Sequence, residues 1–234
     1  AERWLGAIAD QGKAAQTAPA EMVVLDEVEF RRLPGSIAVH RAGLALVTGD
    51  VAGTLKYARQ ALDLVPEEDL LGRGAASALL GLVSWTNGDL EAARRAYVDS
   101  MAKLLKAGNT SDVLGCSIAL ADMHMGQGHL REAMRTFERG LQLGMGPGNP
   151  ALVVRGTADM HVGLCEINRE RDELGTAMQH LLRSQELGQF KELSQNPYRW
   201  RAAMARIREA QGNLEGALDL LNEAERLYYG DFSP

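Results

Sequence analysis

Two residue types that bind metal ions stand four positions apart in the middle of the chain. His161 and Cys165 would lie on one face of a helix, because four residues make about one helical turn. An imidazole and a thiolate are both common zinc ligands. The sequence places no further ligand to complete such a site, and both residues fall where the apolar pattern predicts packing between helices. We therefore predict that both are buried and that this segment holds no metal.

A glycine-rich segment is the other feature that could bind a charged group. The run "GMGPGNP" (Gly144–Pro150) follows a predicted helix rather than a strand and contains two prolines, which is typical of a linker and not of a phosphate-binding loop. No Ser/His/Asp or Cys/His set can be assembled from the sequence, since such a set is defined by geometry. We expect that the segment is not an enzyme and binds no cofactor.

Composition narrows the possible partners. The formal net charge of −6 provides no basic surface of the kind that nucleic acid requires. No run of apolar residues is long enough to span a membrane, and the N-terminus lacks the pattern of a signal peptide. We expect a cytoplasmic protein without direct contact to nucleic acid or membrane, in which Cys116 and Cys165 are buried free thiols.

A short phrase recurs along the chain and indicates how the side chains are positioned. "TGDVAGT", "NGDLEAA", "QGHLREA" and "QGNLEGA" each place a glycine before a helix start, and in "RDELGTA" an aspartate takes that position. We call these five positions the turn residues: Gly49, Gly88, Gly128, Asp172 and Gly212. They are 39, 40, 44 and 40 residues apart, and an internal period of this length predicts a repeat array.

Each turn residue joins two predicted helices. The apolar runs before the turns are Ser36–Val47, Arg73–Thr86, Asp112–Met125, Val153–Asn168 and Tyr198–Ala210, and a second run follows, as in Leu90–Lys106 and Leu130–Leu143. Glycine supplies the left-handed backbone that ends the first helix. Asp50, Asp89 and Asn213 fit the N-cap of the second helix. Proline should stop helices between the pairs, at Pro66, Pro147, Pro150 and Pro197.

Seven residues before each turn residue the side chain is small, as the set Ala42, Gly81, Ala121, Cys165 and Ala205 shows. A small residue lets two antiparallel helices approach closely, and stacked pairs can then share their apolar faces. We predict an all-α fold: a tetratricopeptide-like superhelix, or α-solenoid, of about five antiparallel helix pairs in a single domain over residues 1–234. The units are expected near residues 34–66, 70–107, 112–145, 151–190 and 197–229. Residues 1–33 are expected to form a degenerate N-terminal unit, and the chain to be a piece of a longer protein.

The first helix of each pair is expected to line a concave groove. Six residues before the turn residue come Gly43, Leu82, Asp122, Glu166 and Arg206; three before it come Leu46, Trp85, Met125, Arg169 and Glu209; about thirteen before it come Ser36, Ala75, Gly115, Asp159 and Tyr198. The candidate ligand-binding residues are Trp85, Asp122, Met125, Asp159, Glu166, Arg169, Tyr198 and Arg206. A tryptophan beside carboxylates and arginines is suited to a polar ligand such as a sugar. The alternative for these charges is a solvated, salt-bridged surface.

Three longer runs, Leu70–Met101, Arg155–Leu174 and Tyr198–Pro234, resemble the helical repeat region of MalT-like regulators, the large ATP-binding members of the LuxR group of bacterial transcription factors. The resemblance covers essentially the whole chain. It implies a sensor segment that, in the family, lies between an ATPase with a winged-helix element and a C-terminal helix-turn-helix. ATP and DNA would then bind other domains of the regulator, and the resemblance specifies no ligand.

Two functions remain open from the sequence. In the first, the chain is the ligand-sensing superhelix of a MalT-like transcriptional activator, and a small-molecule effector in its groove controls activation of the full-length regulator. In the second, the chain is a protein–protein scaffold whose groove holds a peptide, a partner domain or another domain of the same regulator. The apolar residues Leu46, Leu82 and Trp85 favour the second function, because apolar stripes often receive a partner helix.

Overall fold

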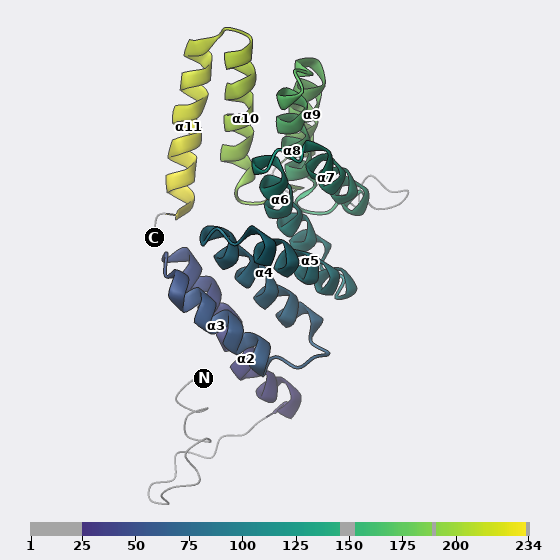
Figure 1. The fold of residues 1–234 in the computed structure, drawn as a ribbon, viewed down its shortest axis with the longest axis vertical. Helices are drawn as coiled ribbons and strands as arrows, with labels where there is room; N and C mark the ends of the chain where they lie inside the picture. The colour runs from purple at the N-terminus through teal and green to yellow at the C-terminus, as the bar shows by residue number, and fades with distance from the viewer. Residues whose placement is uncertain (1–24, 146–152, 189–190, 233–234) are drawn as a thin grey trace, which may run out of the picture.

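The computed structural model describes residues 25–145, 153–188 and 191–232, and these residues form five antiparallel helix pairs. The pairs are α2 (Glu27–Val47) with α3 (Val51–Leu64), α4 (Leu70–Thr86) with α5 (Leu90–Lys106), α6 (Thr110–Gly126) with α7 (Leu130–Gly144), α8 (Thr157–Glu170) with α9 (Leu174–Leu187), and α10 (Asn196–Ala210) with α11 (Leu214–Phe232). Figure 1 shows them stacked in chain order into a curved array, with α2 and α3 at one end and α10 and α11 at the other. The predicted all-α, tetratricopeptide-like solenoid is confirmed.

The turns between paired helices have the predicted backbone. The four turn glycines have φ between 75° and 80°, and Asp172 in the fifth turn has φ 60°. The N-caps are confirmed as well. Asp50 and Asp89 each accept a hydrogen bond from the backbone N–H three residues on, at 2.8 and 2.9 Å, and Asn213 accepts one from Gly216 at 3.0 Å. The left-handed turn thus forms the junction in all five pairs, and a side-chain cap supports it in three of them, since His129 and Glu173 make no cap hydrogen bond.

The five small residues that precede the turns are all buried, as predicted. A side chain added at Gly81 would lie 3.0 Å from the ring of Tyr97 on α5, so glycine there allows α4 and α5 to pack closely. Large side chains of the second helices then fill the space between neighbouring pairs. Phe137 of α7, for example, packs in one cluster with residues of α6 and α8. Within the described residues no helix is both long enough and apolar enough to cross a bilayer.

The first helix begins earlier than the sequence suggested. Asp26 caps α2 by accepting hydrogen bonds from the N–H groups of Val28 and Glu29, and the helix continues through Pro34. The fixed φ of proline is compatible with a helix, at the loss of one backbone hydrogen bond. Residues 27–33 thus belong to the first pair rather than to a separate N-terminal unit. Residues 1–24 of that expected unit lie outside the described residues.

The fourth and fifth pairs also begin differently from the expectation. The helix expected from Val153 starts only at Thr157, because residues 154–156 bond to other segments: the N–H of Val154 donates to Gly144 O, and that of Gly156 to Lys191 O. Pro197 was expected in a linker but lies in the first turn of α10, where its missing N–H is not needed. Residues 146–150 of the glycine-rich segment, with Pro147 and Pro150, lie outside the described residues.

Candidate functional site

Two neighbouring cavities open on the face formed by the first helices α4, α6, α8 and α10, which we call the concave face. The charged cavity has a volume of about 420 Å³ and is lined by Asp122, Met125, Val162, Glu166, Tyr198, Arg199, Ala202 and Arg206. The apolar cavity has about 530 Å³ and lies against α4 and α6, with Leu82 and Trp85 in its wall. The two cavities share Asp122, Tyr198 and Arg199. Four of the five repeats therefore contribute to one continuous hollow.

A bidentate ion pair crosses the charged cavity. The guanidinium of Arg199 donates to Asp122 through Nη1···Oδ2 at 2.7 Å and Nη2···Oδ1 at 3.1 Å, and both side chains are about one quarter exposed. Arginine and carboxylate paired in this way form a strong and geometrically specific contact. Because Asp122 lies on α6 and Arg199 on α10, the pair connects the third repeat to the fifth.

A second cluster of charges surrounds Glu166 on α8. Its carboxylate accepts hydrogen bonds from Arg206 of α10 at 2.8 Å and from Arg169, one turn further along α8, at 3.3 Å. Arg169 also pairs with the exposed Glu170. Glu166 is buried, and two guanidinium groups compensate for its charge, as the burial of an ionised carboxylate requires.

Asp159 lines neither cavity, although the helical periodicity of the sequence predicts it in the groove. The residue is buried below the concave face, and its Oδ2 accepts a hydrogen bond from the N–H of Leu193 at 2.8 Å. Burial raises the pKa of Asp159 to about 6, although the Leu193 N–H and the charge of Arg199 act in the opposite direction. Asp159 therefore holds the segment that leads into α10, and it lies outside the lining of both cavities.

The structure brings together six of the eight candidate residues. Asp122, Met125, Glu166, Tyr198 and Arg206 line the charged cavity, and Trp85 lines the apolar cavity. Arg169 lies beside them through its bond to Glu166. The structure thus gives the location of these seven side chains, and ligand binding by them stays a prediction.

The register expected from the sequence did not include two features of the site. The residue thirteen positions before Gly212 is Arg199 and not Tyr198, so the sequence register was one residue off in the last repeat. Tyr198 still lines both cavities, with its ring at a centroid distance of 5.4 Å from that of Tyr228. The position ten residues before each turn residue also faces the hollow, as Ala78, Ile118, Val162 and Ala202 show. Residues thirteen, ten, six and three positions before the turn have the 3–4–3 spacing of one helical face. This spacing in the sequence predicts both Arg199 and the position ten residues before the turn as part of the face.

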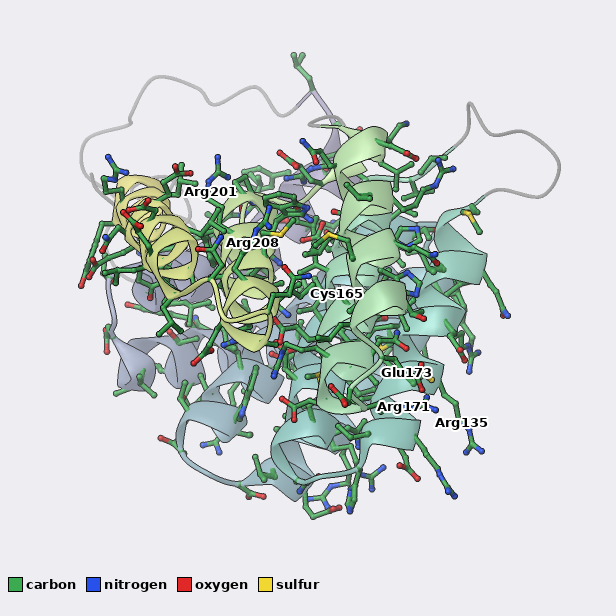
Figure 2. The ribbon with its side chains drawn as sticks, turned by 90° about the horizontal axis from the view of Figure 1, so that it is seen from above. Arg135, Cys165, Arg171, Glu173, Arg201 and Arg208 are labelled. Carbon is green, nitrogen blue, oxygen red and sulfur yellow. The ribbon has the colours of Figure 1, made fainter. Side chains whose placement is uncertain are left out.

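His161 and Cys165 are buried, as predicted, and line neither cavity. The Nδ1 atom of His161 lies 3.0 Å from Nδ1 of His180 on α9, and burial together with this neighbour lowers the pKa of His161 to about 4. Cys165 packs with residues of α9 and α10 (Figure 2), and burial raises its pKa to about 12. Among the described residues no three His, Cys, Asp or Glu side chains are grouped so that they could hold a metal ion.

Comparison with known proteins agrees with this architecture. The family model described as "MalT-like TPR region" matches residues 35–234. No curated protein matches the sequence. Among solved structures, the apo form of RapI has a TM-score of 0.57 at 11% identity and covers 88% of this chain and 87% of that one. BtubC (BKLC) from P. vanneervenii has a TM-score of 0.53 at 14% identity, with 88% and 92% covered. TPR-like repeats of a putative kinesin light chain from Podosopora anserina have a TM-score of 0.51 at 16% identity, with 87% and 97% covered. At these identities the structural likeness shows the fold alone.

Proposed function

Since this chain belongs to the family of MalT-like TPR regions, we propose that its concave face binds a small polar effector in the charged cavity and so serves as the sensor of a MalT-like regulator. One observation carries the proposal: acidic and arginine side chains from three repeats converge on a hollow of about 420 Å³. Small-molecule sites commonly have volumes of this order and a few convergent polar groups.

The charges of the cavity favour a neutral ligand rich in hydrogen-bonding groups. Asp122 and Glu166 contribute two negative charges, and Arg199 and Arg206 contribute two positive ones, so the lining has no net charge to attract an ion. A polyhydroxyl compound such as a sugar can donate to the carboxylates and accept from the guanidinium groups. The ring of Tyr198 offers an apolar surface on the same wall. We therefore expect a sugar-like effector rather than a phosphate or an organic cation.

Binding at this place would couple to the shape of the array. The Arg199–Asp122 pair connects α6 to α10, and a ligand that takes over either group would release or reinforce this connection. The effector shifts the equilibrium between two curvatures only by its difference in affinity for them. The other domains of a MalT-like regulator would then respond to the curvature of the superhelix.

A thermal-shift screen of the 234-residue chain against mono- and oligosaccharides and small organic acids tests the proposal. A saturating sugar should raise the unfolding midpoint, since a hundredfold excess over Kd stabilises the folded state by ~2.7 kcal/mol. Asp122→Asn and Arg206→Ala should abolish this shift without loss of helicity. Arg208→Ala is the matched control, because Arg208 is an exposed residue of the same helix that lines neither cavity (Figure 2).

The apolar cavity supports the scaffold function as the alternative. Its wall contains Leu82, Trp85 and Ile118, which suits the apolar side chains of a peptide or partner helix. If no small molecule raises the midpoint but a peptide or a partner domain does, the sensing proposal fails and the scaffold function stands. If Asp122→Asn or Arg206→Ala instead unfolds the chain, these residues are part of the packing and not a binding site.

A further inference from the structure

A groove of about 360 Å³ lies between the second helices α5 and α7. These two helices form its walls, and Val113, Ser117 and Leu120 of α6 form its floor. We call it the outer groove. It shares no residue with the charged cavity or the apolar cavity, so a ligand can occupy it independently of the site of the proposed function. Its volume lies within the range of small-molecule sites.

The outer groove is apolar along most of its length. Val98 and Leu105 of α5 are 48% and 41% exposed in its wall. The hydroxyls of Ser117 and Thr136, which also line it, donate to backbone carbonyls four residues earlier in their own helices, at 2.8 and 2.9 Å. The wall therefore offers a ligand apolar surface, and both hydroxyl protons are already used within the helices.

Two arginines one helical turn apart, Arg135 and Arg139 of α7, supply the only charges of the lining. Both are exposed, and Arg135 lies at the edge of the molecule in Figure 2. Among the described residues, neither forms an ion pair or a hydrogen bond through its side chain. The acidic residues of the same helix, Glu132 and Glu138, are exposed and lie outside the lining. The groove thus has two guanidinium groups free to bind an anion.

The positive charges and the apolar surface lie towards opposite ends of the groove. On α7, the two arginines are seven and eleven residues after the turn residue, and Leu143 is fifteen after it. Leu143 packs in one cluster with Val113 near the start of α6, and Leu105 lies near the end of α5. The lining part of α5, residues 98–105, extends over about 10 Å at 1.5 Å per residue. A ligand that fills the groove therefore needs an anionic group at one end and an apolar chain behind it.

The corresponding positions of the other second helices do not combine these features. At the position of Val98, ten residues after the turn residue, α3 has Arg59 and α7 has Glu138. At the positions of the two arginines, α5, α9 and α11 have, in this order, Arg95 and Asp99, Gln179 and Arg183, and Asp219 and Glu223. Arg183 is moreover paired with Glu186 at 2.8 Å. Among the described helices, the outer groove alone has an apolar wall across from two free arginines.

We infer that the outer groove binds an aliphatic carboxylic acid of medium chain length. The carboxylate accepts hydrogen bonds from Arg135 and Arg139, since guanidinium groups and carboxylates form charge-assisted pairs. The chain lies along Val98 and Leu105 towards Leu143 and buries apolar surface there. Because this ligand contacts α5 of the second repeat and α7 of the third, the array responds to an apolar acid at a site separate from that of the proposed polar effector.

Isothermal titration calorimetry of the 234-residue chain with hexanoate, octanoate and decanoate tests the inference. Each methylene that enters the groove should tighten binding by roughly fourfold. The double substitution Arg135→Gln/Arg139→Gln should weaken octanoate binding at least about tenfold. It should leave the binding of 1-octanol unchanged, because the alcohol has no carboxylate.

Two further variants locate the ligand. Ala102→Phe should weaken the binding of both octanoate and 1-octanol, since Ala102 is an exposed residue of the lining and a larger side chain there fills the groove. Arg183→Gln is the matched control, because Arg183 occupies the position of Arg139 one repeat further on and lies outside the lining. Its octanoate affinity should equal that of the wild type.

Three results would overturn the inference. The first is an absence of binding by all three acids, both in the calorimeter and in the unfolding midpoint. The second is an octanoate affinity that equals that of 1-octanol or survives the double arginine substitution, because the arginines would then not bind the acid. The third concerns the source of the chain: the protein should stay in solution with phosphatidylglycerol vesicles, and sedimentation with them that the double substitution abolishes would assign the groove to a lipid surface instead of a free acid.

Discussion

Gly163 is the position where the structure makes the most demanding stability prediction. A Cβ atom added there would lie 2.2 Å from Cζ of Phe137 and 2.4 Å from both Cε atoms, where ordinary contact begins at 3.4 Å. The Phe137 ring is fully buried among Leu114, Ile118, Met160 and Leu164, so it has no free space into which to move. The substitution Gly163→Ala therefore forces α7 and α8 apart by roughly 1 Å or displaces the ring into its neighbours.

The expected magnitude is the difference between two opposing effects. Overpacking a buried contact costs about 1–3 kcal/mol, and the severity of this contact places it at the upper end. Alanine in the interior of a helix is more favourable than glycine by about 1 kcal/mol. We expect Gly163→Ala to lower the free energy of unfolding by ~2 kcal/mol. Gly43→Ala is the control, because Gly43 lies inside α2 with no atom of another residue close to the added Cβ, and it should stabilise the protein by ~0.5–1 kcal/mol.

Urea denaturation followed by far-UV circular dichroism measures both effects, provided the dependence on urea concentration stays the same between variants. Phe137→Leu should destabilise the wild type by leaving a cavity, yet it should relieve Gly163→Ala, so that the double variant is more stable than the sum of the two single changes by at least ~1 kcal/mol. Additive effects, or a Gly163→Ala variant as stable as the Gly43→Ala control, would contradict the close packing of α7 on α8.

Two further predictions concern single residues. Burial raises the pKa of Asp159 to about 6, so the folded protein keeps this proton between pH ~4 and ~6 when the unfolded chain has lost it, and stability falls as the pH rises through that interval. The pKa of His161 is lowered to about 4, so the unfolded chain takes up a proton below pH ~6.5 and stability falls as the pH decreases towards 4. Asp159→Asn and His161→Gln should therefore change the pH profile of unfolding in opposite directions, by up to ~3 kcal/mol each, and parallel profiles would contradict this. In the turn between α8 and α9, Asp172→Gly should raise the free energy of unfolding by ~0.5–1 kcal/mol, because Asp172 has a left-handed backbone with φ 60°. In the turn between α6 and α7, Gly128→Ala should lower the free energy of unfolding for the same reason. Equal effects of the two substitutions in thermal denaturation would contradict the left-handed turn.

The parts of the fold that depend on residues close together in the chain could be predicted from the sequence. The turn residues, the caps at Asp50 and Asp89, and the small residues before each turn depend on interactions within one helix pair, and the structure has them as expected. The starts of α2 and α8 could not be predicted in this way. Pro34 is tolerated inside a helix, and residues 154–156 bond to residue 144 and to the segment around Lys191.

The candidate site was predictable as a surface but not as a set of contacts. Helical periodicity identifies Asp122, Glu166 and Arg206 as residues of one face, whereas the partner of Asp122 lies 77 positions further along the chain and depends on the curvature of the array. Asp159 follows the same periodicity but turns inward to the N–H of Leu193. Likewise, the contact between His161 and His180 depends on the distance between α8 and α9, which one sequence does not contain.

The bond between Arg199 and Asp122 has a consequence for how the array transmits a disturbance. In an ideal repeat array each repeat contacts only its two neighbours. A local conformational change is therefore transmitted from repeat to repeat and weakens with distance. Here the ion pair couples the fifth repeat directly to the third, so a conformational change in one can reach the other without first changing the fourth. The three C-terminal repeats should therefore unfold and refold as one cooperative unit.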